Sequence, residues 1–231
     1  MPASLHTRAR GLVERTADIA KRFGRRAALT DLQHRMVNQV VSTAVLRGMT
    51  AVERDIDPAF FEAGGFEARW ATEREALATA EDAELGRETS AAFVRGALAK
   101  GDRCFALFGD NGIVSHGWYS MKPTQLDDEL VLHFDPAWAY MYKGYTLHGY
   151  RGRRLHAIGM SLALRTLTRE GARGLVSYVN ATNFQSLRST ERMGYVAFGD
   201  VYVMRLFGRP RTWATPGCAA YQFRAERSAT A

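Results

Sequence analysis

Three arginines and a glycine lie together in one short stretch, at Arg151, Gly152, Arg153 and Arg154. The residues around them predict that a strand ends before this turn and that a helix begins within it. At a helix N-terminus, free backbone N–H groups converge and the helix dipole adds partial positive charge. Such a turn can bind phosphate, and guanidinium groups can pair with phosphate oxygens through two hydrogen bonds. The alternative is a solvated basic loop that merely precedes a helix.

A second segment with helix-capping residues runs from Asn180 to Tyr195. Asn183 follows a predicted strand and can cap the next helix, which Gly194 can end. Taken alone, this segment predicts no more than a capped helix with Glu191 and Arg192 on its exposed face.

Together, the two segments resemble the signatures of the GNAT superfamily, the GCN5-related N-acetyltransferases. That family has a strand followed by Arg/Gln-x-x-Gly-x-Gly/Ala at a helix start. A later Asn-containing helix closes with Gly-Phe or Gly-Tyr. Residues 146–152 resemble the common Val-x-Pro-x-Tyr-Arg-Gly entry, and the resemblance extends from Phe66 to residue 207. The positions that match the second signature are Asn183, Ser186, Glu191, Gly194 and Tyr195.

The resemblance implies an enzyme, an acyl-CoA-dependent N-acyltransferase that uses acetyl-CoA or another acyl-CoA and needs no metal. An amine of an unidentified acceptor would attack the thioester directly. The strand at 145–147 would pair with the pantetheine arm, the amides of 152–156 would hold the pyrophosphate, and Asn183 would face the pantetheine. The residues assigned in this way to the cofactor are Tyr145, Thr146, Leu147, Arg151, Gly152, Arg153, Arg154, Leu155, His156, Asn183 and Ser186.

Four positions depart from the family pattern. Arg154 stands where the family usually has glycine, His156 where it has glycine or alanine, and His148 where it has proline. Thr190 occupies the position of a tyrosine thought to protonate the leaving thiolate in many members. Because a threonine hydroxyl is a far weaker acid than a phenol, that role is in doubt here.

The strand before the turn also lacks the glutamate that the family often places there. Amine acylation needs a neutral amine, an oriented carbonyl and a route for the proton, and a base with a pKa near neutrality would help. The candidates for this chemistry are Tyr142, His133, Asp135 and Thr190, or a water chain held by the histidine and aspartate. The alternatives are a hydrogen-bonded strand histidine and a packed aromatic ring. His133 and Asp135 lack a third ligand, so no metal site is predicted.

The elements that must position these residues predict an α/β fold. The order is that of a GNAT-like mixed central sheet with splayed parallel strands flanked by helices. Residues 1–64 are expected to form a mainly helical N-terminal extension, 65–215 the acyltransferase domain and 216–231 a C-terminal tail. Strands are predicted at 66–70, 104–108, 113–121, 130–147, 175–179 and 196–207. The stretch at 130–147 is either one strand or two strands joined near Asp135 and Pro136. Helices are predicted within 5–47, 73–100, 153–170 and 183–193.

Composition limits the remaining classes of protein. The chain has 231 residues, 46% of them hydrophobic, and a net charge of +7. No apolar run approaches the roughly 20 residues that span a bilayer, so no transmembrane segment is expected. With two cysteines and no secretory signal, a cytoplasmic location is expected.

Two rival functions stay open. A basic nucleic-acid-binding protein would need a contiguous basic face, but the arginines are scattered among acidic residues, so no nucleic acid is expected. A GNAT-like domain that binds an acyl-CoA or an acyl carrier protein without turnover is favoured by the missing tyrosine and glutamate. A homodimer also stays open.

Overall fold

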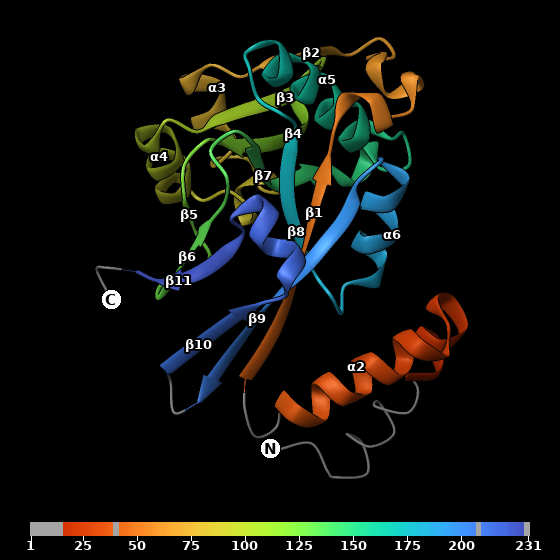
Figure 1. The fold of residues 1–231 in the computed structure, drawn as a ribbon. Helices are drawn as coiled ribbons and strands as arrows, with labels where there is room; N and C mark the ends of the chain where they lie inside the picture. The colour runs from red at the N-terminus through yellow and green to blue at the C-terminus, as the bar shows by residue number, and fades with distance from the viewer. Residues whose placement is uncertain (1–15, 39–41, 207–208, 229–231) are drawn as a thin grey trace, which may run out of the picture.

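A strongly twisted eight-stranded sheet forms the body of the protein (Figure 1). The structure is a computed structural model that describes residues 16–38, 42–206 and 209–228. The strand order is β10-β9-β1-β8-β7-β4-β3-β2, and a second sheet has the order β11-β6-β5. Among the described strands, only β7 and β8 pair in parallel. The mixed α/β fold predicted from the sequence is confirmed.

The elements have the following bounds. The large sheet contains β1 (Ser42–Ala51), β2 (Glu67–Trp70), β3 (Arg103–Gly109), β4 (Gly112–Ser120), β7 (Ala139–Thr146), β8 (Leu175–Asn180), β9 (Val196–Leu206) and β10 (Arg209–Ala214). The small sheet contains β5 (Thr124–Gln125), β6 (Leu130–His133) and β11 (Arg224–Arg227). The helices are 16–23, α2 (Arg25–Asn38), α3 (Glu73–Ala78), α4 (Ala91–Lys100), α5 (Leu155–Arg169) and α6 (Phe184–Arg192). None of the described helices has the length and apolar character needed to cross a bilayer.

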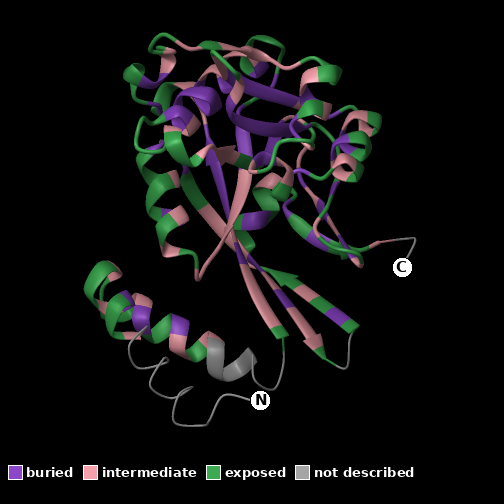
Figure 2. Ribbon diagram, turned by 180° about the vertical axis from the view of Figure 1, so that it is seen from behind, coloured by how far each residue is buried: buried purple, intermediate pink, exposed green. Residues whose placement is uncertain are grey.

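Helices cover both faces of the sheet because neighbouring strand residues point to opposite sides. Phe105, Leu107 and Met141 lie in one core cluster with the buried face of α5. Cys104 and Trp118 lie in another cluster with Val94 and Ala97 of α4, and Tyr142 packs against it. Figure 2 shows the buried residues concentrated in the body of the sheet, whereas α2 is mostly exposed or intermediate. The sheet therefore has an α5 face and an α4 face.

The N-terminal extension is the largest correction to the sequence-based prediction. Helices occupy 16–23 and α2, as expected, but β1 is a central strand that pairs antiparallel with both β8 and β9 (Figure 1). The expected boundary near residue 64 is thus wrong for this segment. Residues 42–51 form a strand because they pair with β8 and β9, which are far away in the sequence. Local periodicity cannot reveal such pairing. The predicted helix within residues 5–15 lies outside the described residues.

The C-terminal tail is likewise part of the body. A 3₁₀ turn at Pro216–Tyr221 buries Cys218, and β11 then pairs with β6. The stretch at 130–147 forms two strands, β6 and β7, which belong to different sheets. The two strands are the second of the two arrangements expected for this stretch. The tail was assigned wrongly because the second sheet is assembled from segments about 90 residues apart in sequence, a separation that local pattern reasoning does not bridge.

Truncation of Met49 tests whether β1 belongs to the core. Met49 is 2% exposed and lies in the main core cluster. Met49→Ala should lower the free energy of unfolding by about 2–5 kcal/mol, because it removes buried methylenes and leaves a cavity. Leu29→Ala is the control, since Leu29 on α2 is 55% exposed and its loss should cost little. Urea denaturation measures both, and equal small losses would contradict the placement of β1.

Candidate functional site

The parallel strands β7 and β8 part soon after they begin. Their backbones pair only at Ala139–Leu175 and Tyr140–Val176. At the next residue the Ser177 hydroxyl donates to the Met141 carbonyl oxygen at 2.8 Å, so a side chain replaces the ladder. Because parallel strands run the same way, the wedge between them opens toward the carboxyl ends of both.

A β-bulge in β7 turns that strand away from β8. On its other edge, Tyr142 pairs with Trp118 and Tyr145 with His116, so two residues of β7 oppose one of β4. One of the two, Lys143, has a φ of +51°, a left-handed conformation that is uncommon without glycine. Bulges bend a strand and increase its twist. The edge of β7 that faces β8 is therefore left without a strand partner beyond Tyr140.

The turn after β7 presents free backbone donors. Gly152 has a φ of +80° and Arg154 a φ of +60°, and α5 begins at the buried Leu155. Within the described residues, the N–H groups from Gly152 through His156 donate to no other group. The left-handed conformation explains why glycine suits position 154, where an arginine costs about 1 kcal/mol. The turn has the geometry of an anion site at a helix N-terminus.

The three arginines of the turn are exposed and lie beside aromatic rings. Arg151 donates to the Thr146 carbonyl at 3.3 Å and to the Tyr145 hydroxyl at 3.1 Å. Arg153 lies over the Tyr150 ring at 5.4 Å, and Arg154 over the Phe60 ring at 6.0 Å. These contacts orient the guanidinium groups, which add positive charge to the region of the turn.

The other edge of β7 is fixed by β4. Leu147 N–H donates to the Val114 carbonyl at 3.0 Å, and the Thr146 and Ser115 hydroxyls lie 2.8 Å apart. Tyr145, Thr146 and Leu147, which the sequence assigned to the pantetheine arm, therefore follow the wedge directly and precede the turn.

Glu84 is a residue of this region that the sequence did not reveal. Its Oε1 accepts from the Tyr145 hydroxyl at 3.0 Å and from the His148 N–H at 2.6 Å. Burial first, and then the Glu84 carboxylate, raise the pKa of Tyr145. Glu84 comes from the connection between α3 and α4, so no motif near the turn could have indicated it.

His156 fits against β7 because position 144 is glycine. A Cβ on Gly144 would overlap with the His156 ring and would lie 2.8 Å from the Met141 methyl group. At position 156 the family has glycine or alanine, whereas this chain has the larger histidine. The absence of a side chain at Gly144 leaves the space that the His156 ring occupies. Burial lowers the pKa of His156 and thus favours the neutral imidazole.

His116 on β4 is a second buried histidine of this region, and its pKa is influenced by His156. It is 2% exposed, and neither ring nitrogen has a hydrogen-bond partner within the described residues. Burial, and to a smaller degree the neighbouring His156, lower the pKa of His116 to about 4. Both imidazoles are therefore neutral at neutral pH, so neither histidine is an ionised group of the site.

The second signature lies on α6 as predicted, but its polar groups are used locally. The Asn183 side chain caps α6 by accepting from Ser186 N–H at 3.1 Å. The Thr190 hydroxyl donates to the Leu187 carbonyl at 2.9 Å and contacts the Met49 sulfur at 3.3 Å. Thr190 therefore faces β1, and its hydroxyl already has partners.

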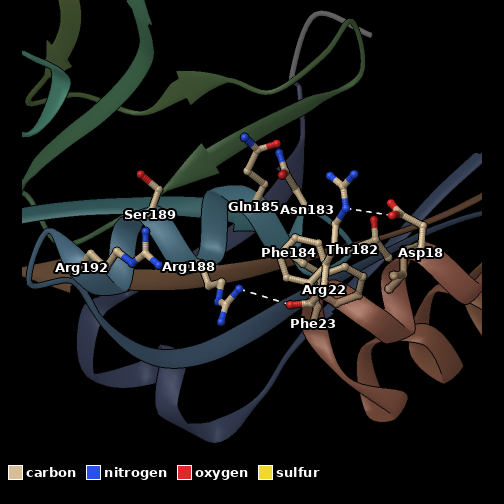
Figure 3. A pocket seen from close by; sticks show the side chains of 11 residues that line it. Asp18, Arg22, Phe23, Thr182, Asn183, Phe184, Gln185, Arg188, Ser189 and Arg192 are labelled. Atoms are coloured by element: carbon tan, nitrogen blue, oxygen red, sulfur yellow. Dashed lines mark hydrogen bonds and ion pairs between the residues drawn. The ribbon is translucent and has the colours of Figure 1, made fainter. Parts of the chain in front are cut away.

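A hollow of about 760 Å³ lies between α6 and the helix at 16–23 (Figure 3). Phe23 and Phe184 pack against each other across it, with ring centroids 5.6 Å apart. Arg188 reaches from α6 to the Arg22 carbonyl at 3.2 Å. Asn183 lines the hollow as well, so the N-terminal helix covers the beginning of α6.

His133 and Asp135 do not meet the wedge. His133 lies in the small sheet, where its Nε2 is 3.3 Å from Glu226. Asp135 Oδ1 accepts from Ala137 N–H at 2.9 Å in the turn that leads into β7. Both residues precede the paired end of β7, the opposite end from the turn at Arg151. A contact across the small sheet accounts for His133, and a turn hydrogen bond accounts for Asp135.

Tyr142 is the one catalytic candidate that the structure places at the wedge. It follows the last β7–β8 pair by two residues and lies beside the bulge. Its hydroxyl donates to a buried carboxylate, Asp102, and burial first and that hydrogen bond second raise its pKa. Among the described residues, no group of three or more His, Cys, Asp or Glu side chains could hold a metal ion.

Comparisons with known proteins concern the fold. No protein-family model and no curated protein matches the sequence. A Drosophila protein of known structure matches with a TM-score of 0.50 and 16% identity, over 78% of this chain and 57% of that chain. A functionally unknown Staphylococcus epidermidis protein matches with a TM-score of 0.49 and 8% identity, over 75% and 65%. A GCN5-related N-acetyltransferase from Sphaerobacter thermophilus matches with a TM-score of 0.49 and 14% identity, over 86% and 56%.

The fold is GNAT-like. The chain has the parallel pair that parts, the bulge on the strand before the turn, and the helix that begins at the Arg151–His156 turn. The parting pair and the helix after the turn stand in the order that the family resemblance implies, whereas the bulge is a finding of the structure. The chain spans between 56% and 65% of the length of these three structures. At such low identity the similarity concerns architecture alone.

The fit between Gly144 and His156 predicts strong coupling between the two positions. Gly144→Ala should lower the free energy of unfolding by about 1–3 kcal/mol, because its methyl group meets the imidazole. In a His156→Ala background the same substitution should cost little, which gives a coupling energy above about 1 kcal/mol in a double-mutant cycle. Gly149→Ala is the control, since nothing lies within 4 Å of a Cβ there. Additive losses in urea denaturation would contradict the fit.

The buried His116 predicts a loss of stability in acid. Its pKa in the folded protein, about 4, is below the usual 6.5. Its contribution is therefore fully present above about pH 6.5 and is lost as the pH falls toward 4. His116→Leu should reduce the loss between pH 7.5 and 4.5 by about 2–3 kcal/mol, measured by urea denaturation. The exposed His148→Leu is the control and should retain the wild-type loss; an equal loss in His116→Leu would refute the assignment.

Proposed function

We propose that the protein is an acyl-CoA-dependent N-acyltransferase, with acetyl-CoA as the first donor to test. An amine of the acceptor would attack the thioester directly. The observation that carries this proposal is the junction of the wedge and the turn. A strand edge without a partner at β7 leads directly into a turn with five unbonded N–H groups and three arginines.

The chain's residues suit the parts of an acyl-CoA in order. The N–H groups of 152–156 and the dipole of α5 can hold the diphosphate, and Arg151, Arg153 and Arg154 can add charge-assisted hydrogen bonds. The free edge of β7 can pair with the amides of an extended pantetheine arm, as a strand edge pairs with a peptide. A backbone N–H at the bulge can stabilise the developing oxyanion, a contribution of a few kcal/mol.

A binding protein without turnover is the second candidate. The observation in its favour is that the Thr190 hydroxyl is bound to Leu187 and Met49. In that case the same turn would hold an acyl-CoA, or the phosphopantetheine of an acyl carrier protein. For either function we place the protein in the cytoplasm, where its two buried free cysteines, Cys104 and Cys218, would stay reduced.

Charge reversal at Arg151 tests whether the turn holds the phosphates of the acyl donor, acyl-CoA. Isothermal titration with acetyl-CoA should show binding by the wild type. Arg151→Glu should weaken it at least about 10-fold, or about 1.4 kcal/mol, because a carboxylate would face the diphosphate. Arg211→Glu on β10 is the matched control, with the same change of charge on an exposed residue, and should bind like the wild type.

Two outcomes would contradict the donor assignment. If the wild type binds neither acetyl-CoA nor longer acyl-CoAs, the acyl-CoA function falls. If Arg151→Glu and Arg211→Glu bind equally well, the turn does not hold the phosphates. Release of CoA thiol with primary amines then separates the enzyme from the binding protein.

A further inference from the structure

Tyr142, the tyrosine of β7 just beyond its last pair with β8, is hydrogen-bonded to the buried carboxylate of Asp102. Tyr142 lies on the α4 face of the sheet, the face opposite α5 and its phosphate turn. Its hydroxyl donates to Asp102 Oδ2, and its ring lies between Tyr140, stacked at 5.3 Å, and Phe93 of α4 at 5.9 Å. Tyr142 itself is only partly buried. A phenol oxygen that donates to one group can still accept a hydrogen bond from another.

The end of α4 holds Asp102 rigidly. Gly101 ends the helix with a φ of +95°, and the N–H of Asp102 bonds back to the Ala97 carbonyl at 2.9 Å. The N–H of Gly101 bonds to the Leu98 carbonyl at 2.9 Å as well. These two hydrogen bonds form the Schellman motif, which fixes the residues after a helix. The Asp102 side chain is 1% exposed. Its carboxylate is therefore shielded from solvent, and the hydrogen bond from Tyr142 links it to β7.

Lys100 neutralises this carboxylate. Its Nζ lies 3.0 Å from Asp102 Oδ2 and donates to Ser120 at 3.1 Å and to Thr124 at 2.6 Å. Burial of an ion pair is weak as a source of stability, since apolar residues of similar volume often serve as well. The Lys100–Asp102 ion pair is hydrogen-bonded to Tyr142, which is part of β7 just beyond its last pair with β8. This position suggests a role for the ion pair other than stability.

We infer that Tyr142 and Asp102 form a proton relay for acyl transfer, with Lys100 as a positioning residue. This inference rests on the proposed acyltransferase function. In the relay, Asp102 at the end of α4 provides the carboxylate that the family often has as a glutamate on the strand before the turn. The relay also makes a tyrosine at position 190 unnecessary, because one relay can take up the proton and return it.

The protons balance in two steps. A neutral amine attacks the thioester carbon, and as the C–N bond forms its N–H becomes acidic. That proton passes to the Tyr142 oxygen while the phenol proton passes to Asp102 Oδ2. The C–S bond then breaks, the sulfur leaves as thiolate, and Asp102 returns its proton through Tyr142 to the sulfur. The products are the amide and the CoA thiol, and the relay ends in its starting state.

The groups around Tyr142 are few. Asp102 and Lys100 face it from the end of α4, with Lys100 Nζ 5.6 Å from its ring. Cys104 approaches from β3 and Tyr140 from β7, while Lys122 bonds to the Lys100 carbonyl at 2.8 Å. Lys143 points to the Phe93 ring at 5.5 Å. Burial and the hydrogen bond to Asp102 keep the phenol protonated, which the relay requires.

Paired isosteric variants test the relay. Acetyl-CoA is combined with a panel of primary amines (spermidine, lysine, glycine and an arylamine), and kcat, KM and thiol release are measured. Tyr142→Phe and Asp102→Asn should each lower kcat about 100-fold, a typical contribution of general acid–base catalysis. The dissociation constant of acetyl-CoA should stay unchanged. The double variant should fall no further than either single one, because both remove the same relay. Tyr202→Phe on the distant strand β9 is the control and should keep the wild-type kcat.

Several outcomes would overturn the relay. If Tyr142→Phe turns over at the wild-type rate, the relay is wrong and the proposed function stands. If the losses add, or if acetyl-CoA binding weakens in parallel, Tyr142 and Asp102 are structural. If the wild type binds acetyl-CoA but releases no thiol with any amine, the catalytic assignment falls together with the relay. Absence of acetyl-CoA binding would remove the proposed function itself.

Discussion

The separation of β7 from β8 after two residue pairs is the constraint on which the rest of the site depends. Strands in a sheet normally satisfy their backbone groups on each other, and a buried N–H or C=O without a partner is costly. Here the bulge at Lys143 turns β7 away, and the Ser177 hydroxyl serves the Met141 carbonyl where the ladder ends. The edge that this separation exposes, continued by the free N–H groups after Arg151, is the feature that can receive an extended, phosphate-bearing ligand.

The parting also requires that β7 be held from elsewhere. On the α5 face, Gly144 allows His156 to pack directly on the bulge, and on the α4 face Asp102 holds the Tyr142 hydroxyl. The far side of β8 needs its own partner, and β1 provides it from the N-terminal part of the chain. A segment that looks like an appendage in the sequence thus stabilises the strand that borders the wedge.

Sequence reasoning found what is encoded locally. The neighbouring strands at 104–108 and 113–121, the helix after Arg154 and the capped helix at Asn183 follow from strand patterning and capping chemistry, which act within a few residues. The turn at Arg151–His156 was predicted because its glycine, arginines and helix start are contiguous. Glu84, Asp102 and the place of β1 were missed, since each reaches the site from a distant part of the chain. His133 and Asp135 were chosen for residue type and nearness in sequence, and the fold places them at the other end of β7.

Residue type alone misleads at the site for an energetic reason. A histidine or carboxylate can act as a base only if the protein has solvated or paired it so that it exchanges protons at working pH. His116 and His156 are disfavoured by burial, which lowers both of their pKa values and leaves them neutral packing groups. Asp102 is as buried as His116, yet Lys100 compensates its charge and Tyr142 connects it to the wedge. Among these groups, compensation of charge and a path for the proton, rather than proximity in sequence, select the one that can take part in chemistry.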